Sequence, residues 1–195
     1  MNPDLVLQVI RHRRTIKPDQ FSREKVPRGV INDILASANW APTYENTEPW
    51  RFVVFEGHAK CELARIRAAL QEKRNESDAD ADAATMLQIR LEEAGQCSHI
   101  IALGMKRHVE VPEITEIMGT GCAIQNMLLT AASHGVGVKW SFGGRRYSDE
   151  LRSFLGLAPN DGLFGFLLIG YPRNEWPEGK RHAPISDKVQ WHGDE

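Results

Sequence analysis

The stretch Ala41-Pro-Thr-Tyr-Glu-Asn-Thr-Glu-Pro-Trp50 separates a helical pattern from a run of β-forming residues at 52–55. Its two prolines and small polar residues are typical of a loop. Thr43 and Asn46 offer hydrogen bonds, the prolines stiffen the backbone, and Trp50 can pack underneath. These residue types suit a flat polar ligand, but an ordinary connection between a helix and a strand has a similar composition.

Helix and strand patterns alternate on both sides of this loop. Apolar residues at helical spacing, with prolines near helix starts and glycines after helix ends, predict the helices. Short runs of apolar, β-forming residues predict the strands, and the first of these is expected to be buried. The first expected helix begins at 3 and runs out into 12–17, where Pro18 closes it. The other expected helices are 26–38, 59–74, 86–95, 113–134 and 149–155, and the expected strands are 52–55, 98–105, 136–141 and 163–171.

Four strand candidates separated by helices predict an α+β or α/β domain. A chain of 195 residues suggests one domain, which we expect to span 1–195. The helix at 113–134 is apolar nearly all round, as buried helices are. In so short a chain, we expect part of this burial to come from a second subunit. The tail with Trp176 and Trp191 is also expected to dock on a partner subunit.

Composition excludes several classes of function. The net charge of −2 argues against nucleic acid as the main partner. No apolar run reaches membrane-spanning length, and the first residues do not resemble a signal peptide. Cys61, Cys97 and Cys122 are odd in number and widely spaced, which predicts free thiols in a reducing cytoplasm. The seven histidines are scattered, so no metal site is expected.

A basic segment, His12-Arg-Arg-Thr-Ile-Lys17, follows the first helix and ends before Pro18. Such a segment can be a solvated helix end, whose positive charges suit the helix dipole. It can equally bind a phosphate group. Two other patterns favour structural interpretations. The alternating acids at 78–82 lack the offsets of a calcium loop, and the glycines at 119 and 121 suit close helix packing better than a dinucleotide site.

Four motifs together resemble one family. Ala-Pro-Thr-x-x-Asn-x-Glu-Pro-Trp, starting at Ala41, is similar to the Ala-Pro-Ser-x-x-Asn-x-Gln-Pro-Trp signature of the FMN-dependent nitroreductase family. Residues 13–15 resemble its Arg-x-Ser motif. The remaining matches, in the same order, are 135–137 with 140–144, and 170–172 followed by 180–184. The length of the chain resembles the small single-domain branch of that family.

This resemblance implies a nitroreductase-like, three-layer α/β/α fold with a mixed, mostly antiparallel central sheet. It also implies an intertwined homodimer whose long central helices form the core, with two FMN sites at the subunit interface. Residues 71–97 would form part of the cover on the substrate side.

The resemblance also assigns residues to the phosphate end of FMN and the nearby ring edge: Arg13, Arg14, Thr15, Lys17, Lys180 and Arg181. The arginines would bind the phosphate, because a guanidinium group can do so bidentately. Thr15 keeps the hydroxyl of the family's Ser. Lys17 would lie near the N1/O2 edge of the ring, where a cation stabilises the reduced flavin.

A second set of residues would contact the rest of the cofactor: Pro42, Thr43, Asn46, Trp140, Ser141, Phe142, Gly143 and Gly144. The resemblance implies that the first three come from the other subunit. Trp140, Ser141 and Phe142 would line the ring, and the backbone N–H of Gly143 could donate toward N5.

The implied activity is reduction of nitroaromatics, quinones or similar electron-poor acceptors by NADH or NADPH in a ping-pong reaction. Because the flavin carries the chemistry, no protein residue is expected to be catalytic. Glu48 replaces the family's Gln and would oppose a reduced flavin if it were ionised near the ring. The bulky Tyr44 and Glu45 leave the acceptor open. Two alternatives remain, namely a specialised dehalogenase or metabolite dehydrogenase, and a flavin-binding sensor without activity.

Overall fold

The fold is built on a sheet of four strands in the order β1-β2-β4-β3, in which every neighbouring pair is antiparallel. The computed structural model describes residues 3–69, 83–142 and 147–193. The strands are β1 (Trp50–Glu56), β2 (His99–Met105), β3 (Gly137–Ser141) and β4 (Gly162–Gly170). The four strand predictions are confirmed, with ends that shift by one or two residues.

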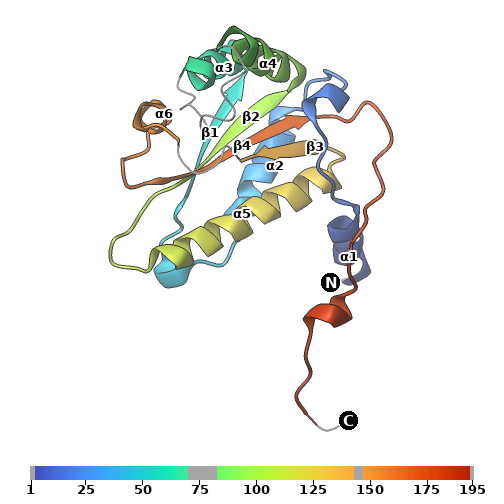
Figure 1. Ribbon diagram of the computed structural model, residues 1–195. Helices are drawn as coiled ribbons and strands as arrows, with labels where there is room; N and C mark the ends of the chain where they lie inside the picture. The colour runs from blue at the N-terminus through green and yellow to red at the C-terminus, as the bar shows by residue number, and fades with distance from the viewer. Residues whose placement is uncertain (1–2, 70–82, 143–146, 194–195) are drawn as a thin grey trace.

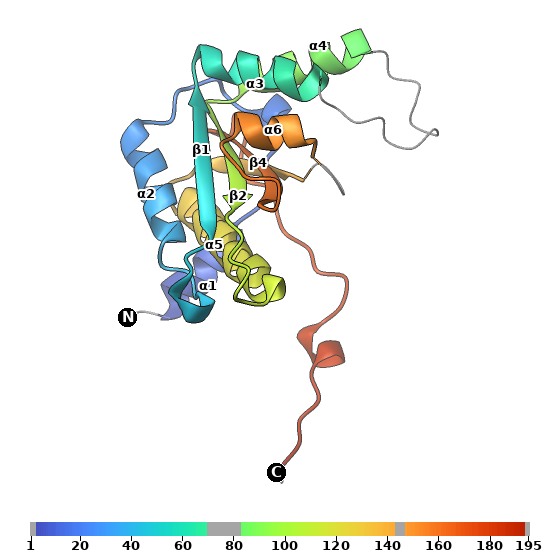
Figure 2. The same ribbon diagram turned by 90° about the vertical axis from the view of Figure 1, so that its left-hand side faces the viewer.

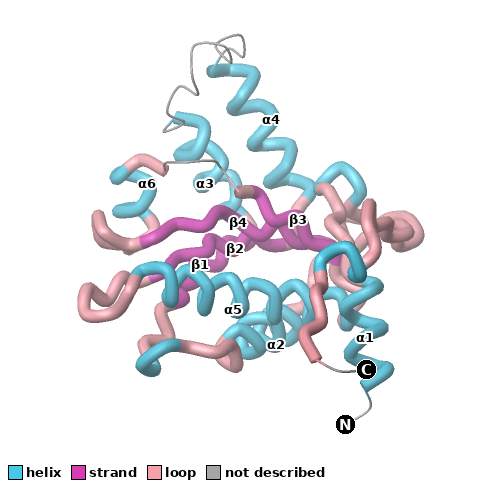
Figure 3. Tube along the Cα trace, turned by 60° about the horizontal axis from the view of Figure 1, so that its bottom comes forward, coloured by secondary structure: helices cyan, strands magenta, loops and turns pink. Residues whose placement is uncertain are grey.

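Helices cover both faces of the sheet and give three layers (Figures 1 and 3). One side carries α1 (Pro3–His12), α2 (Arg28–Ala38) and α5 (Glu113–Ser133). The other side carries α3 (His58–Ala69), α4 (Ala83–Gln96) and α6 (Asp149–Phe154). The predicted α+β, three-layer architecture is confirmed. Thr15 forms an isolated bridge with Val138 of β3, and this bridge is parallel, unlike the strand pairs of the sheet.

The first strand differs from its prediction because it lies at the edge of the sheet. The run at 52–55 was expected to be buried. Phe55 is buried, but Phe52 and Val53 are half-buried and Val54 is 38% exposed. β1 pairs with β2 alone, so its other edge stays open. The helix expected at 59–74 is described from His58 to Ala69. The acidic run at 78–82 lies outside the described residues.

Helix ends follow the signals in the sequence. The Ser148 hydroxyl accepts a hydrogen bond from the backbone N–H of Leu151 at 3.3 Å and caps α6. Gly135 and Gly156 adopt φ values of +68° and +71° directly after α5 and α6, a conformation that favours glycine. The predicted caps and helix stops at these places are confirmed.

Within one chain, α5 is buried on one side only. Its inner side places Ile124 and Met127 in the core. Gly119 packs so closely against the preceding loop that a Cβ atom there would lie 3.1 Å from the carbonyl oxygen of Pro42. Close packing is therefore found at Gly119, against a loop and not a helix, whereas no described atom lies within 4 Å of a Cβ atom built on Gly121. The opposite side exposes Ile114, Ile117, Met118 and Cys122.

After β4 the chain crosses to α1 and then runs away from the body of the fold (Figures 1 and 2). The indole of Trp176 stacks on the His12 ring with 4.8 Å between ring centroids. Its N–H donates to the carbonyl oxygen of His12 at 2.6 Å. Trp176 therefore anchors the start of the tail to the end of α1, while Trp191 is left exposed.

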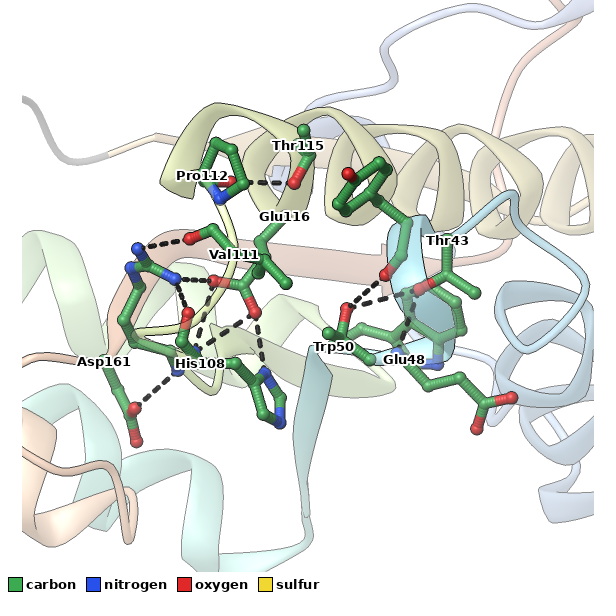
Figure 4. A network of polar contacts seen from close by, with 12 residues as sticks. Thr43, Glu48, Trp50, His108, Val111, Pro112, Thr115, Glu116 and Asp161 are labelled. Atoms are coloured by element: carbon green, nitrogen blue, oxygen red, sulfur yellow. Dashed lines mark hydrogen bonds and ion pairs between the residues drawn. The ribbon is translucent and has the colours of Figure 1, made fainter.

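A buried carboxylate holds the loop between β2 and α5 (Figure 4). Glu116 is only 1% exposed, and Arg107 Nη1 and His108 Nδ1 lie 2.5 and 2.7 Å from its oxygens. Arg107 Nη2 also donates to the carbonyl oxygen of Val111 at 2.7 Å. Burial would raise the pKa of Glu116, but the bonds from His108 and Arg107 outweigh it and lower that pKa. Glu116 therefore remains ionised and fixes this loop to α5.

Replacing Glu116 with Ala should lower the free energy of unfolding by about 3 kcal/mol or more, because Arg107 loses its buried partner. Urea unfolding followed by tryptophan fluorescence measures the change. Glu110→Ala, at an exposed position of the same loop, is the control and should change it by less than about 0.5 kcal/mol. Equal stability of the two variants would contradict a net stabilising role for Glu116.

Candidate functional site

Three arginines from the two ends of the chain gather at the C-terminal end of α1. Arg13 and Arg14 follow the helix, and Arg181 comes from the tail. Burial, followed by the charges of Arg14 and Arg181, lowers the pKa of Arg13, so these guanidinium groups lie within electrostatic range. Among the described residues, no carboxylate pairs with Arg13 or Arg181. Lys180 is exposed, and its carbonyl accepts from Arg181 at 3.0 Å.

Arg14 is the most constrained of the three. Its Nη1 donates to the carbonyl oxygens of Arg11 and Arg13 at 2.5 and 2.7 Å, which closes the end of α1. Its Nε is buried without a hydrogen-bond partner. A Cβ atom on Gly179 would lie 2.0 Å from this guanidinium, so a residue with a side chain would displace it. Arg14 also lines a groove of about 890 Å³ between α1, the end of α5 and residues 176–179.

Thr15 and Lys17 connect this basic end to the sheet. Thr15 forms the parallel bridge with Val138 of β3, and the backbone N–H of Ile16 donates to the Val138 carbonyl oxygen at 3.2 Å. The Lys17 side chain is exposed, and its backbone N–H donates to Gln20 Oε1 at 3.2 Å. The structure therefore joins the arginine end to the strand that leads toward Trp140.

The end of β3 presents aromatic surface. The Trp140 indole N–H donates to the carbonyl oxygen of Phe164 at 2.8 Å, and its ring meets Phe142 edge to face at 6.4 Å between centroids. Phe142 is 60% exposed, and Ser141 is half-buried. Gly165 has φ of +101°, and a Cβ atom there would lie 2.3 Å from the Ser141 carbonyl oxygen. Gly143 and Gly144 lie outside the described residues.

The loop at 41–50 adopts an unusual backbone that side chains hold in place. Glu45, Asn46 and Glu48 have φ values of +51°, +53° and +41°, which non-glycine residues rarely adopt. The Thr43 hydroxyl accepts from the backbone N–H of Glu48 at 3.0 Å and lies 3.3 Å from Thr47 Oγ1 (Figure 4). Such strain is often found at functional loops.

The base of the same loop is fixed by Trp50. This side chain is buried, as expected from the sequence, and its indole N–H donates to Asn39 Oδ1 at 3.2 Å. Pro42 and Asn46 are exposed, so their side chains are available to a ligand or another chain. Asn39 was not identified from the sequence, because only the folded loop brings it to Trp50.

The two halves of the predicted FMN site lie far apart along α5. The 41–50 loop contacts α5 at Gly119, whereas the groove beside Arg14 includes Ala132 of the same helix. Between these two residues the helix rises about 20 Å. One chain therefore brings together the arginines, Thr15, Lys17 and β3, but it does not bring the Pro42, Thr43 and Asn46 group to them.

Sequence reasoning missed a charged cluster beside β3. Lys139 Nζ lies 2.9 Å from Glu93 Oε1, and Arg90 Nη1 lies 2.9 Å from Glu93 Oε2. Burial would raise the pKa of Glu93, but Lys139 and Arg90 outweigh that effect and lower it. No local motif signals this cluster, because Lys139 and Glu93 are brought together only by the packing of α4 on the sheet.

Other kinds of site find no support in the described part of the chain. Across residues 3–69, 83–142 and 147–193, no group of His, Cys, Asp and Glu residues could hold a metal ion. No helix within these ranges is long and apolar enough to cross a membrane. Cys61, Cys97 and Cys122 are free thiols, as predicted.

Comparisons with known proteins agree with this architecture. The Bacillus subtilis protein YfhC, provisionally named an NAD(P)H nitroreductase, is 30% identical over 181 residues, which cover 92% of this chain and 90% of YfhC. The crystal structure of a nitroreductase-like family protein from Bacillus cereus gives a TM-score of 0.78 at 26% identity, covering 97% of this chain and 96% of the other.

A third comparison supports the fold alone. The FMN-dependent nitroreductase NfnB from Mycobacterium smegmatis, solved in complex with NADPH, gives a TM-score of 0.70 at 19% identity, with 98% of this chain and 100% of NfnB covered.

The sequence model of the nitroreductase family matches residues 10–171. With this match over most of its length, the chain belongs to the nitroreductase family.

Proposed function

We propose that this protein is a homodimeric, FMN-dependent oxidoreductase that takes electrons from NADH or NADPH. Its acceptors are nitroaromatics, quinones or similar electron-poor molecules, which it reduces in a ping-pong reaction. The whole chain, 1–195, acts as one FMN-binding domain. The free thiols are compatible with a reducing cytoplasm, which we propose as its location.

The observation that carries this proposal is the convergence of Arg13, Arg14 and Arg181. Gly179 of the tail lies against the Arg14 guanidinium, and the charges of Arg14 and Arg181 act on Arg13. Within the described part of the chain, none of the three forms an ion pair with a carboxylate. A phosphate dianion fits this arrangement, because it offsets the mutual repulsion and accepts several charge-assisted hydrogen bonds. The partnerless Nε of Arg14 is one donor that the fold leaves unused. The FMN phosphate would be held here.

The remaining residues of this end suit the ring. The Thr15–Val138 bridge ties the phosphate end to β3, which leads to Ser141 and Phe142. These residues would line the ring, and the exposed Lys17 would approach its N1/O2 edge. When bound, FMN would accept a hydride from NAD(P)H and pass two electrons to the acceptor. YfhC, whose provisional name is NAD(P)H nitroreductase, supports this choice of donor.

A second copy of the chain would complete the site. The 41–50 loop lies about 20 Å along α5 from the arginines, so Pro42, Thr43 and Asn46 would reach the cofactor from the partner subunit. The exposed apolar side of α5 offers a surface for this association. Apolar residues of α1 are exposed as well, namely Leu5, Val6, Leu7 and Ile10.

The FMN-loaded protein should therefore sediment as two chains of 22.0 kDa. Substituting Met118 with Glu places a charge on the exposed side of α5, so it should shift the protein to monomers and weaken FMN binding at least tenfold. Analytical ultracentrifugation with absorbance at flavin wavelengths measures both. Ile89→Glu on α4 is the control and should leave the dimer intact. A monomer that binds FMN as tightly as the wild type would rule out the shared site.

The double variant Arg13→Ala, Arg181→Ala should bind FMN at least a hundredfold more weakly, because two charge-assisted contacts to the phosphate are lost. Fluorescence titration of the apoprotein with FMN measures this change. The variant Arg65→Ala, Lys106→Ala removes two exposed positive charges elsewhere and serves as a control for net charge. Unchanged affinity in the first variant would reject the phosphate assignment.

The activity itself is tested by anaerobic addition of NADPH or NADH to the loaded protein. The flavin absorbance should bleach and then recover when a nitroaromatic is added. In the first two-electron step, the nitro compound, NAD(P)H and one proton give the nitroso compound, NAD(P)+ and water. A bound flavin that neither nicotinamide reduces would contradict the proposed activity, and a protein that binds no FMN would contradict the cofactor.

A further inference from the structure

The helices α3 and α4 cover one face of the sheet (Figure 3). A second group of cations lies on this face. Glu93 pairs with Lys139 of β3 and Arg90 of α4, as described above. Arg67 of α3 lies nearby, with its Cζ 4.1 Å from the centre of the Phe166 ring. In the described part of the chain, this cluster contains three cations and one carboxylate, that of Glu93.

The two arginines retain unused hydrogen-bonding capacity. Arg67 faces an aromatic ring and has no hydrogen bond to any described residue. The Nε of Arg90 is buried without a partner. Burial, and next the charge of Arg90, lower the pKa of Arg67 to about 10, so both arginines are charged at neutral pH and repel each other. An anion between them would relieve this repulsion and use the free donors.

The cluster lies beside the strand that would line the flavin ring. Ser141 of β3 is the cross-strand partner of Phe166, so both side chains lie on the same face of the sheet. Lys139 precedes Ser141 by two residues and shares this face. Lys139 and Arg90 keep 29% and 21% of their side-chain surfaces exposed, so a small ligand can reach them.

We propose that Arg67, Arg90 and Lys139 bind an anionic group of the electron acceptor. The preferred acceptors are therefore small aromatic molecules that carry a carboxylate in addition to the reducible group. Two guanidinium groups and an ammonium group match a planar carboxylate in charge and in donor geometry. The FMN phosphate is assigned to the separate Arg13 cluster near Thr15, so it does not fill this one. This inference rests on the proposed flavin site.

Isosteric probes test the charge preference without any substitution. Benzoate and benzamide have nearly the same shape but differ in charge, and neither has a nitro group to reduce. In the FMN-loaded wild type, benzoate should inhibit reduction of 4-nitrobenzoate with an inhibition constant at least about tenfold below that of benzamide. Equal inhibition constants would overturn the proposal.

Substitutions test which side chains produce the preference for a carboxylate on the acceptor. In Arg67→Met, the ratio of kcat/KM for 4-nitrobenzoate over 4-nitrobenzamide should fall about tenfold or more, because the carboxylate loses a charged donor. Lys139→Gln should lower the same ratio and provides a second test if Arg67→Met does not fold. Arg65→Met, an exposed arginine on the same helix, should leave the ratio unchanged. A ratio that survives both Arg67→Met and Lys139→Gln would also overturn the proposal.

Two readouts separate this inference from the proposed function. FMN affinity and the rate of flavin reduction by NAD(P)H should stay within about twofold of wild type in Arg67→Met, because the anion is assigned to the acceptor and not to FMN. If both acceptors lose activity equally, Arg67 supports the fold or the flavin, and the proposal fails alone. If the wild type neither binds FMN nor is reduced, the proposed function and this inference fail together.

Discussion

The length of α5 sets the distance between the two halves of the proposed FMN site. An α-helix rises about 1.5 Å per residue, so Glu113–Ser133 is a rod of roughly 30 Å. The strained 41–50 loop is packed near one end of this rod, at Gly119, and the arginine group lies near the other end. The proposed association of two chains would bring both halves of the site to one cofactor.

Each end of α5 has its own means of holding functional residues. At one end, the Glu116 ion pairs fix the loop before α5, and the Thr43 hydroxyl stabilises the positive φ angles of its neighbours. At the other end, the stack of Trp176 on His12 brings the tail back to α1, so that Arg181 can reach Arg13. Both devices fix the backbone and leave exposed side chains free, which suits a site that must accept a ligand from outside.

Local signals in the sequence were sufficient for most of the fold. Proline and glycine positions predicted the helix ends, and apolar runs predicted all four strands. The predicted burial of 52–55 is correct for Phe55 and wrong for Val54, because a run of apolar residues does not reveal whether its strand lies at the edge of a sheet. Resemblance to a family pointed to Arg13 and Arg181. The meeting of Arg90 and Lys139 on Glu93 was missed, because it depends on how α4 crosses β3 and no short motif encodes that packing.

Net charge does not describe how charge is distributed in this chain. A formal charge of −2 suggests no preference for anions, yet arginines and a lysine are concentrated in two places along β3. Because charges interact strongly over a few ångströms and are screened over longer distances, such local groups determine which ligand is attracted. Near Thr15, the arginines form no ion pair with a carboxylate of the described residues and suit a phosphate. Next to Ser141 they share one carboxylate, Glu93, which reduces their excess charge and suits a weaker, exchangeable anion. This difference in charge suits the proposed roles, because the proposed FMN phosphate would stay bound whereas the proposed acceptor must leave.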